Sequence, residues 1–545
     1  MKKLISPDSD KVIYSLLVIL CLLHAWANYV WLKTDTRPPY YDMAGHTIIT
    51  LRAVDLMQSA CQSPKEALPR LFRLTWGWPP LVHLASASLC ILFGTTADVA
   101  AGVNTVFLMG LIFSTYGIGR RLAGRYVGLL AAFLVSMYPI IFGLSRPYLL
   151  DVPLTTMVSV SMLTLLWTED FSNRRRSLLH GLTLGLGILT KQAFVLFIVG
   201  PFLLAAGKAL LLRETHRRTN LLMASLVAAI VGLPWYIHNY RVVMHYLHAG
   251  RLASIVRGDA LGLSFASLSY YPLALVNHQT LLSLALLFIW GCIALAIWPG
   301  PHRGRAMLGL WILIPYIMFT LSVGPKSERY TMPLLPALAY ISSMAILSVR
   351  TTAIRAVLIG LVVLVATVEF VGLSFGLSAW LPRITRPQVW VQIGGLRLRA
   401  YSENVHIASP PRAEDWQVDN ILRDILADAV VRHSSDKTVM LLVLPNAPFF
   451  EVNTFSYYAL ADQLPVQATA IAGVLEPDDY EQRVFESNYV VTKTGEQGPS
   501  WSLHHVPEIN AALHDPTHPL FARFRLVREY ALPDSSTAEL FRRLE

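Results

Sequence analysis

Charged residues are scarce in this chain of 545 residues. Asp, Glu, Lys and Arg make up 15% of the sequence, hydrophobic residues make up 54%, and the mean hydropathy is +0.47. Soluble domains carry about 25% charged residues, so this composition excludes an ordinary water-soluble protein. Apolar runs of roughly 20 residues, the length that crosses a bilayer core, recur along the chain. The sequence therefore predicts a polytopic α-helical membrane protein.

Cysteine and clusters of metal ligands are scarce too. The sequence has four cysteines and no Cys-x-x-Cys pair or Cys/His cluster, which argues against a disulfide scaffold or a zinc site. The pattern requires no cofactor and does not indicate a divalent metal. No basic stripe or stacking motif points to a nucleic-acid partner. The start "MKKLISPDSDK" runs into an apolar segment without a small-residue cleavage site, which favours a retained first helix.

Hydropathy predicts about eleven transmembrane helices. They fall near 12–32, 97–117, 126–143, 152–168, 178–190, 192–212, 221–238, 281–298, 306–323, 331–348 and 353–378. The run 79–93, "PPLVHLASASLCILF", is shorter and opens with two prolines. Its length fits a helix lying at the membrane surface better than a span.

The distribution of Lys and Arg tests this choice. If 79–93 does not cross, every predicted inner segment is short and basic: "MKK", 119–125, 170–176, 213–218, 301–305 and 350–355. If it crossed, the arginines of 120–125 and 174–176 would lie outside, against the positive-inside rule. We therefore expect an integral protein of a bacterial inner membrane, with a cytoplasmic N-terminus and outer loops at 33–96 and 239–280.

The charge changes sign near residue 380. Residues 1–379 have a net charge of +16, and residues 380–545 have −6. The basic excess of the first part fits topology and contact with membrane lipids. The second part combines a helical pattern at 418–433 with strand-like runs at 438–445 and 488–493. We expect a membrane catalytic domain, 1–379, followed by a soluble extracytoplasmic α/β domain, 380–545.

Several charged residues lie in short outer turns, where the positive-inside rule predicts few Lys and Arg. They are Arg146 and Asp151 in "SRPYLLD", Lys191 in "GILTKQ", and Lys326 and Arg329 in "GPKSERYTMP". A charge near the hydrocarbon costs on the order of 2.5–3.5 kcal/mol on insertion scales, so such residues are usually paired, snorkelling or functional. They share a predicted membrane face with Asp42 of "YYDMAGH". Cations can neutralise a lipid-linked phosphate, and a carboxylate can take a proton from an acceptor.

Structural explanations stand beside these functional ones. Asp42 can serve as the N-cap of a helix at 43–57, and Asp151 can cap a helix with Pro153 in its first turn. Lys191 can snorkel from a tight turn, and Arg329 can pair with Glu328 or a headgroup. A lone histidine such as His46 is more often a structural residue than a ligand.

The order of these motifs resembles a known group of enzymes. An acid lies in the first outer loop ("YYDMAGH"), a Pro-Pro surface segment follows ("WGWPPLVHLASASL"), and "SRPYLLD", "GILTKQ" and "GPKSERYTMPLLPAL" come later. Over roughly residues 10–350 this arrangement resembles the GT-C glycosyltransferases of the family-39 type. That group includes the protein O-mannosyltransferases and the lipid A aminoarabinose transferase.

The resemblance implies a GT-C-like fold and transfer of a sugar from a polyprenyl-phosphate donor with inversion, without a required metal. It implies that Asp42 is the catalytic base. The donor phosphate would be bound by Arg146, Lys191, Lys326 and Arg329, and the site would be lined by Tyr41, His46, Asp151 and Tyr330. The mannosyltransferases have Asp-Glu in the first loop, whereas Met43 follows Asp42 here. The sugar and the acceptor, whether protein, lipid or glycan, stay open.

Two other functions compete with this one. A ligase or polymerase of the same superfamily would use a lipid-diphosphate donor. A non-catalytic transporter, flippase or binding protein would use the same membrane scaffold. Transporters commonly have two related halves with broken helices in matching positions, and the sequence has no such symmetry. Its unusual charges gather at one face, which favours a site at the membrane surface.

Overall fold

The computed structural model describes most of the chain. The described ranges are 7–60, 62–75, 77–212, 214–260, 262–297, 304–322, 324–382, 386–432, 438–471, 480–503 and 505–544. The basic segment "MKK", Arg213 of the segment 213–218 and residues 301–303 of the segment 301–305 lie outside these ranges.

Each of the eleven predicted ranges falls on a helix. These helices are α1 (Pro7–Thr34), α6 (Val103–Leu122), α7 (Arg125–Met137), α9 (Asp151–Thr168), α10 (Arg174–Ile188), α11 (Phe194–Leu211), α12 (Thr215–His238), α15 (Leu281–Ile297), α16 (Arg305–Leu321), α17 (Leu335–Ser348) and α18 (Thr352–Phe375). Short helices α5 (Ala97–Ala101) and α8 (Pro139–Gly143) and the turn η2 (Met332–Leu334) adjoin them. Five helices in the described ranges are long and apolar enough to cross a membrane. A membrane helical fold is confirmed, and the count of eleven spans stays a prediction.

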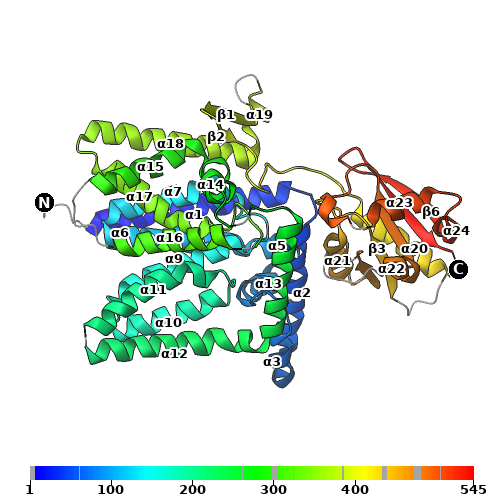
Figure 1. The fold of residues 1–545 in the computed structure, drawn as a ribbon, viewed down its shortest axis with the longest axis horizontal. Coiled ribbons are helices and arrows are strands. Elements are labelled where there is room, and N and C mark those ends of the chain that lie inside the picture. The colour runs from blue at the N-terminus through cyan, green and yellow to red at the C-terminus, as the bar shows by residue number, and fades with distance from the viewer. Residues whose placement is uncertain are drawn as a thin grey trace.

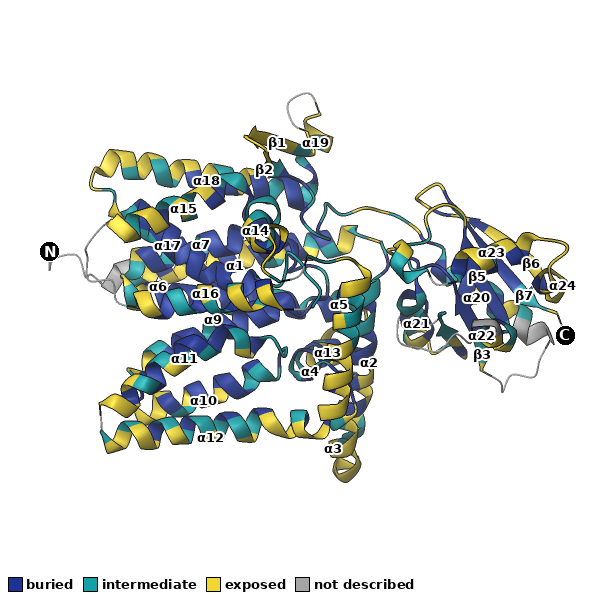
Figure 2. Ribbon diagram, in the orientation of Figure 1, coloured by how far each residue is buried: buried dark blue, intermediate teal, exposed yellow. Residues whose placement is uncertain are grey.

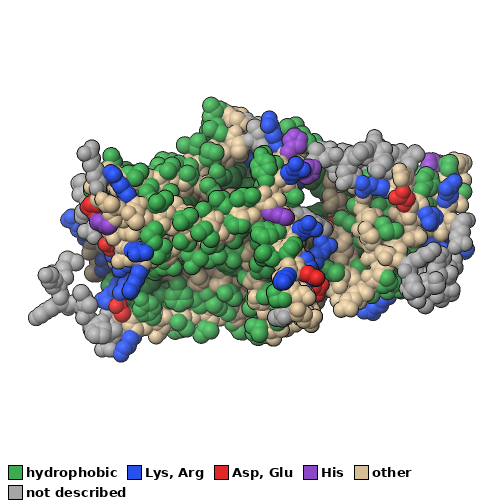
Figure 3. Space-filling model, turned by 90° about the horizontal axis from the view of Figure 1, so that it is seen from below, with side chains coloured by type: hydrophobic (Ala, Val, Ile, Leu, Met, Phe, Trp, Pro, Cys, Tyr) green, Lys and Arg blue, Asp and Glu red, His purple; other side chains and the backbone are tan. Residues whose placement is uncertain are grey.

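The long helices pack side by side in one bundle (Figure 1). Its interior is buried, and the outward faces of α12 and α18 expose large apolar side chains such as Leu222, Ile230, Leu361 and Leu364 (Figure 2). Figure 3, which views the molecule from the side of α12, shows a broad hydrophobic band with charged side chains gathered toward its ends. The basic segment 119–125 and residues 214–218 meet at one end, where Arg121 and Arg217 both contact Glu169.

Other helices are arranged differently. Helices α2 (Tyr41–Ala60) and α13 (Tyr240–Val256) run across the opposite end of the bundle (Figure 1). Helices α3 (Pro64–Phe72), α4 (Leu81–Phe93), α14 (Phe265–Ala274) and α19 (Leu377–Trp380) and the π-turn η1 (Leu275–Gln279) complete this region. Helix α4 has 13 residues, a length of roughly 20 Å, which is short for a hydrocarbon core of about 30 Å. This length agrees with a helix at the membrane surface.

The C-terminal part is an α/β structure, as the sequence predicts. Strands β3 (Val439–Val443) and β5 (Tyr489–Lys493) coincide with the two predicted runs. They belong to a five-stranded sheet of order β4-β3-β5-β7-β6, completed by β4 (Val466–Thr469), β6 (Phe524–Ala531) and β7 (Thr537–Arg543). Helices α20 (Val418–Arg432) and α21 (Val452–Ala461) cover one face of the sheet. Helices α22 (Tyr480–Glu486), α23 (Val506–His514) and α24 (Pro519–Arg523) and the turn η3 (Ser500–Ser502) cover the other.

A separate hairpin precedes this sheet. Strands β1 (Gln388–Ile393) and β2 (Leu396–Ser402) pair antiparallel. The hairpin lies against the helical part, where the backbone N–H of Arg399 donates to Asn277 of η1 over 2.9 Å. The domain boundary at 379/380 stays a prediction.

Candidate active site

Asp42 lies in the first turn of α2, close to where the chain leaves α1. Pro38 and Pro39 separate the two helices, because proline lacks the N–H that a continuing helix needs. The carboxylate of Asp42 accepts a hydrogen bond of 2.8 Å from Nη2 of Arg329. Residues 287 positions apart in the sequence therefore meet in one ion pair.

This ion pair continues into a network of four charges. Nη1 of Arg329 lies 3.5 Å from Oδ2 of Asp151, and Nζ of Lys191 donates to Oδ1 of Asp151 over 2.8 Å. The four side chains come from the start of α2, the start of α9, the turn between α10 and α11, and the turn before η2. Two carboxylates and two cations balance, which lets the charges lie close to the apolar bundle.

The two carboxylates differ in accessibility. The side chain of Asp42 keeps 44% of its surface accessible, whereas that of Asp151 keeps 2%. A substrate can therefore reach Asp42, and Asp151 is an internal anchor for Lys191 and Arg329. Of the two carboxylates, Asp42 is therefore the one open to a bound molecule.

The network also sets the protonation of Asp42. Close packing raises the pKa of its carboxyl, but the charge of Arg329 and the neighbouring His46 and Lys191 outweigh this and hold the pKa below its ordinary value. Burial lowers the pKa of His46 to about 4, against the opposing charge of Asp42. At neutral pH the site therefore holds an ionised Asp42 beside a neutral His46.

Aromatic and histidine side chains surround the charges. Nζ of Lys191 lies 5.6 Å from the ring centre of Tyr330, and Cζ of Arg329 lies 5.8 Å from it. Nδ1 of His46 lies 3.1 Å from Nε2 of His83 on α4, a hydrogen-bonding distance. The structure thus brings together Asp42, His46, Asp151, Lys191, Arg329 and Tyr330 of the predicted set.

Two aromatic side chains near His46 were not predicted from the sequence. The ring of Trp78 lies 4.8 Å from that of His46 and 5.5 Å from that of Tyr246. Trp78 stands in the quoted segment "WGWPPLVHLASASL", so the motif contained it without singling it out. Tyr246 lies in an amphipathic helix far along the chain, and its sequence context carries no comparable signal.

Two predicted phosphate ligands lie elsewhere. Arg146 is 1% exposed, donates to Oδ1 of Asn28 and to Oγ of Ser374, and stacks near Trp31. Nζ of Lys326 donates to the carbonyls of Phe319 and Thr320 at the end of α16 over 3.1 Å each, a common arrangement at a helix C-terminus. The structure does not join either residue to the ion-pair network. Tyr41 precedes Asp42, but its hydroxyl donates to the carbonyl of Asn446.

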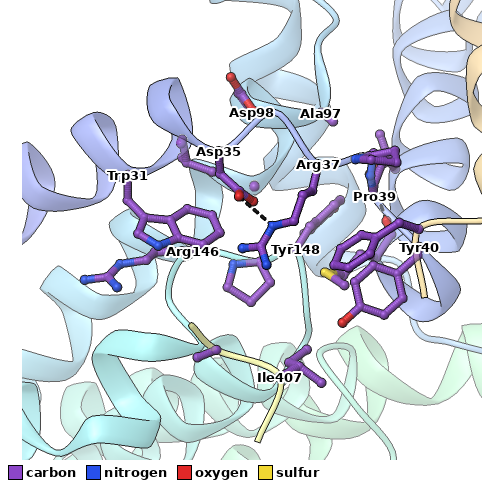
Figure 4. A pocket seen from close by; sticks show the side chains of 18 residues that line it. Trp31, Asp35, Arg37, Pro39, Tyr40, Ala97, Asp98, Arg146, Tyr148 and Ile407 are labelled. Carbon is purple, nitrogen blue, oxygen red and sulfur yellow. Dashed lines mark hydrogen bonds and ion pairs between the residues drawn. The ribbon is translucent and has the colours of Figure 1, made fainter. Parts of the chain in front are cut away.

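A pocket with a cavity volume of about 90 Å³ lies beside α2, lined by Trp31, Tyr40 and Tyr148 among others (Figure 4). An ion pair of 2.7 Å between Arg37 and Asp35 lies inside it. The Arg146 guanidinium lies beside Trp31, on the side away from Tyr40 (Figure 4). Met43 and Thr47 line this pocket, so it faces a different side of α2 from Asp42 and His46.

Two structural explanations can also be judged. The N-cap of α9 is Leu150, and Asp151 stands inside the first turn with its carboxylate on Lys191. Glu328 is 3.1 Å from Nδ1 of His406, whereas its neighbour Arg329 turns to Asp42. Asp151 is therefore not the N-cap of α9. Glu328 and Arg329 pair with other residues and not with each other.

Comparison with known proteins defines the class first. The family described as dolichyl-phosphate-mannose-protein mannosyltransferase matches residues 78–238. ArnT from Cupriavidus metallidurans in the apo state has a TM-score of 0.59 at 14% identity, covering 98% of both chains. The archaeal oligosaccharyltransferase AglB from Archaeoglobus fulgidus has a TM-score of 0.54 at 12% identity, covering 98% of this chain and 74% of its own. The fold is that of the GT-C membrane glycosyltransferases.

Within that class the chain resembles ArnT and the protein mannosyltransferases. An undecaprenyl phosphate-α-4-amino-4-deoxy-L-arabinose arabinosyl transferase of Pseudomonas paraeruginosa is 31% identical over 273 residues, which are 47% of this chain and 46% of the relative. A transferase of the same name from Pseudomonas fluorescens is 28% identical over 259 residues, 43% of this chain and 42% of the relative. The chain spans about half the length of the curated relatives it matches.

Proposed function

We propose that this protein is an integral-membrane glycosyltransferase. It transfers a sugar from a polyprenyl-phosphate donor to an acceptor on the extracytoplasmic face of a bacterial inner membrane, with inversion at the anomeric carbon. The observation that carries the proposal is the network in which an accessible Asp42 shares Arg329 with the buried Asp151. The curated relatives are named for an undecaprenyl-phosphate-linked aminoarabinose, and one structural relative was determined with undecaprenyl phosphate. This donor is therefore the first to test.

Binding of the donor rearranges the charges. In the free site Arg329 is neutralised by two carboxylates. The donor phosphate takes the place of Asp42 on Arg329 and approaches Lys191, because guanidinium and ammonium groups both bind phosphate oxygens. Asp151 keeps the two cations in place. Asp42 is thereby released toward the acceptor.

Transfer then proceeds as one displacement. The acceptor hydroxyl or amine gives its proton to the carboxylate of Asp42 as its oxygen or nitrogen bonds to the anomeric carbon. The bond from that carbon to the phosphate oxygen breaks on the opposite side, and the electron pair leaves with the polyprenyl phosphate. Arg329 and Lys191 stabilise the negative charge that develops on the leaving phosphate. Attack opposite the leaving group inverts the anomeric carbon.

The replacement Asp42→Asn tests this function. Membranes containing the protein supply acceptor, and the released undecaprenyl phosphate is measured from labelled undecaprenyl-phosphate aminoarabinose. Removing the base lowers the rate by roughly 10²–10⁴-fold, while donor binding persists because Arg329 and Lys191 are unchanged. An Asp42→Asn protein that transfers sugar at the normal rate would show that Asp42 serves only the helix.

A further inference from the structure

The segment that carries Asp42 is held by a part of the chain far away in the sequence. Tyr41, directly before Asp42, has a φ of +47°, in the left-handed region that L residues rarely adopt. Such a conformation persists only where surrounding contacts fix it. The contacts come from residues 446–454 of the C-terminal α/β part, which we call the clamp loop.

Three hydrogen bonds join the clamp loop to the chain before Asp42. The backbone N–H of Tyr41 donates to Oε1 of Glu451 over 2.9 Å, and its hydroxyl donates to the carbonyl of Asn446 over 2.7 Å. Oγ1 of Thr454 donates to the carbonyl of Pro39 over 3.0 Å. Figure 1 shows α21, whose first three residues are the end of the clamp loop, beside α2.

Glu451 is the centre of this arrangement. It is 1% exposed, and the same carboxylate caps α21 by accepting from the backbone N–H groups of Asn453 and Thr454 over 2.8 and 3.0 Å. Its position is therefore fixed by the helix that it caps. A side chain fixed in this way transmits its position to Tyr41, and Tyr41 is bonded directly to Asp42.

We infer that Glu451 is a positioning residue, through which the C-terminal α/β part holds Asp42 at the reacting centre. The inference rests on the proposed function and extends it by giving the C-terminal part a role in the chemical step. Glu451 itself does not touch the ion-pair network. It acts through the backbone of Tyr41 and sets where the Asp42 carboxylate meets the acceptor.

The replacement Glu451→Asp separates the two tasks of this side chain. Aspartate is a favoured N-cap residue, so α21 keeps its cap. Its shorter side chain withdraws from the N–H of Tyr41. We expect kcat for sugar transfer to fall on the order of tenfold, since small misplacements of a reacting group are costly. KM for the donor stays within about twofold, because Arg329 and Lys191 do not move.

A matched control is available in Glu403. Its carboxylate is also buried, at 4% exposure, and accepts from the backbone N–H of Ser378 over 2.7 Å. Glu403→Asp makes the same shortening away from residues 35–42, and kcat keeps its normal value. Hydrogen exchange provides a readout apart from activity. We expect the amide of Tyr41 to exchange roughly tenfold faster in Glu451→Asp than in the wild-type or Glu403→Asp protein, because one hydrogen bond is lost.

The outcomes distinguish this inference from the proposed function. If Asp42→Asn abolishes transfer while Glu451→Asp has normal kcat and normal exchange at Tyr41, the positioning role is wrong and the function stands. If Glu403→Asp lowers kcat as much as Glu451→Asp, the effect is general destabilisation and the inference fails. If Asp42→Asn leaves transfer intact, the proposed function fails first.

Discussion

Arg329 determines the charge state of Asp42. Packing pushes the pKa of Asp42 up, and the guanidinium beside it pulls the pKa below the ordinary value of 3.8. Replacing Arg329 by Gln removes the cation, so the pKa of Asp42 rises. In the proposed mechanism Asp42 acts as a base in its ionised form, so we expect the acid limb of kcat/KM to move to higher pH in Arg329→Gln. The pH profile of kcat/KM for undecaprenyl-phosphate aminoarabinose measures this, since it reports the free enzyme.

Arg528→Gln serves as the control for that profile. Its side chain is 62% exposed on the C-terminal part and pairs with Asp424, so its loss leaves the acid limb where it is in the wild-type protein. An acid limb that does not move in Arg329→Gln would mean that Asp42 is not the titrating base.

The charged residues show which parts of the site could be predicted from the sequence alone. Counting charges on the predicted outer turns brought Asp42, Asp151, Lys191 and Arg329 to one face, and the structure joins all four. The same counting could not separate Arg146 from them. Its neighbours in space, Asn28 and Ser374, lie 118 and 228 positions away. A single sequence does not show which partner a long side chain selects.

Close packing between neighbouring helices stabilises the bundle that carries the site. Helices α6 and α7 approach at Gly119 and Gly128, where a Cβ on Gly128 would lie 2.5 Å from the carbonyl oxygen of Tyr116. Gly128→Val therefore destabilises the bundle by about 1–3 kcal/mol, the usual cost of overpacking. Thermal unfolding in detergent should show a lower midpoint for Gly128→Val.

Gly360 of α18 provides the control, because a Cβ there meets no atom within 4 Å. Gly360→Ala should leave the midpoint unchanged or raise it slightly, since alanine favours the helix. Equal loss of stability in the two variants would contradict the packing argument.

The sequence predicted elements best where hydrophobic length decides them. The long apolar runs became helices, and the short run after Pro79 and Pro80 became α4. The C-terminal part was harder. Strands β3 and β5 are buried apolar runs and were predicted, whereas β6 lies at the sheet edge with most of its residues exposed. An exposed edge strand such as "FRLVREYA" has no apolar alternation to identify it.

At the scale of the whole molecule, the C-terminal part packs against the start of α2 and bonds to Pro39 and Tyr41, just before Asp42. The sequence suggested an outer domain near the acceptor but gave no reason to connect it with the first outer loop. Contacts such as Tyr41 to Glu451 join positions 410 apart, and no local pattern encodes them.

The proposed mechanism requires that a lipid phosphate replaces Asp42 on Arg329 and also binds Lys191, which pairs with Asp151 in the free site. A structure of the full chain with undecaprenyl phosphate bound tests it most directly. We expect phosphate oxygens within hydrogen-bonding distance of Arg329 and Lys191, with Asp151 still bonded to both cations and the Asp42–Arg329 bond broken. A phosphate bound at Arg146 or Lys326, with the Asp42–Arg329–Asp151 network intact, would contradict it.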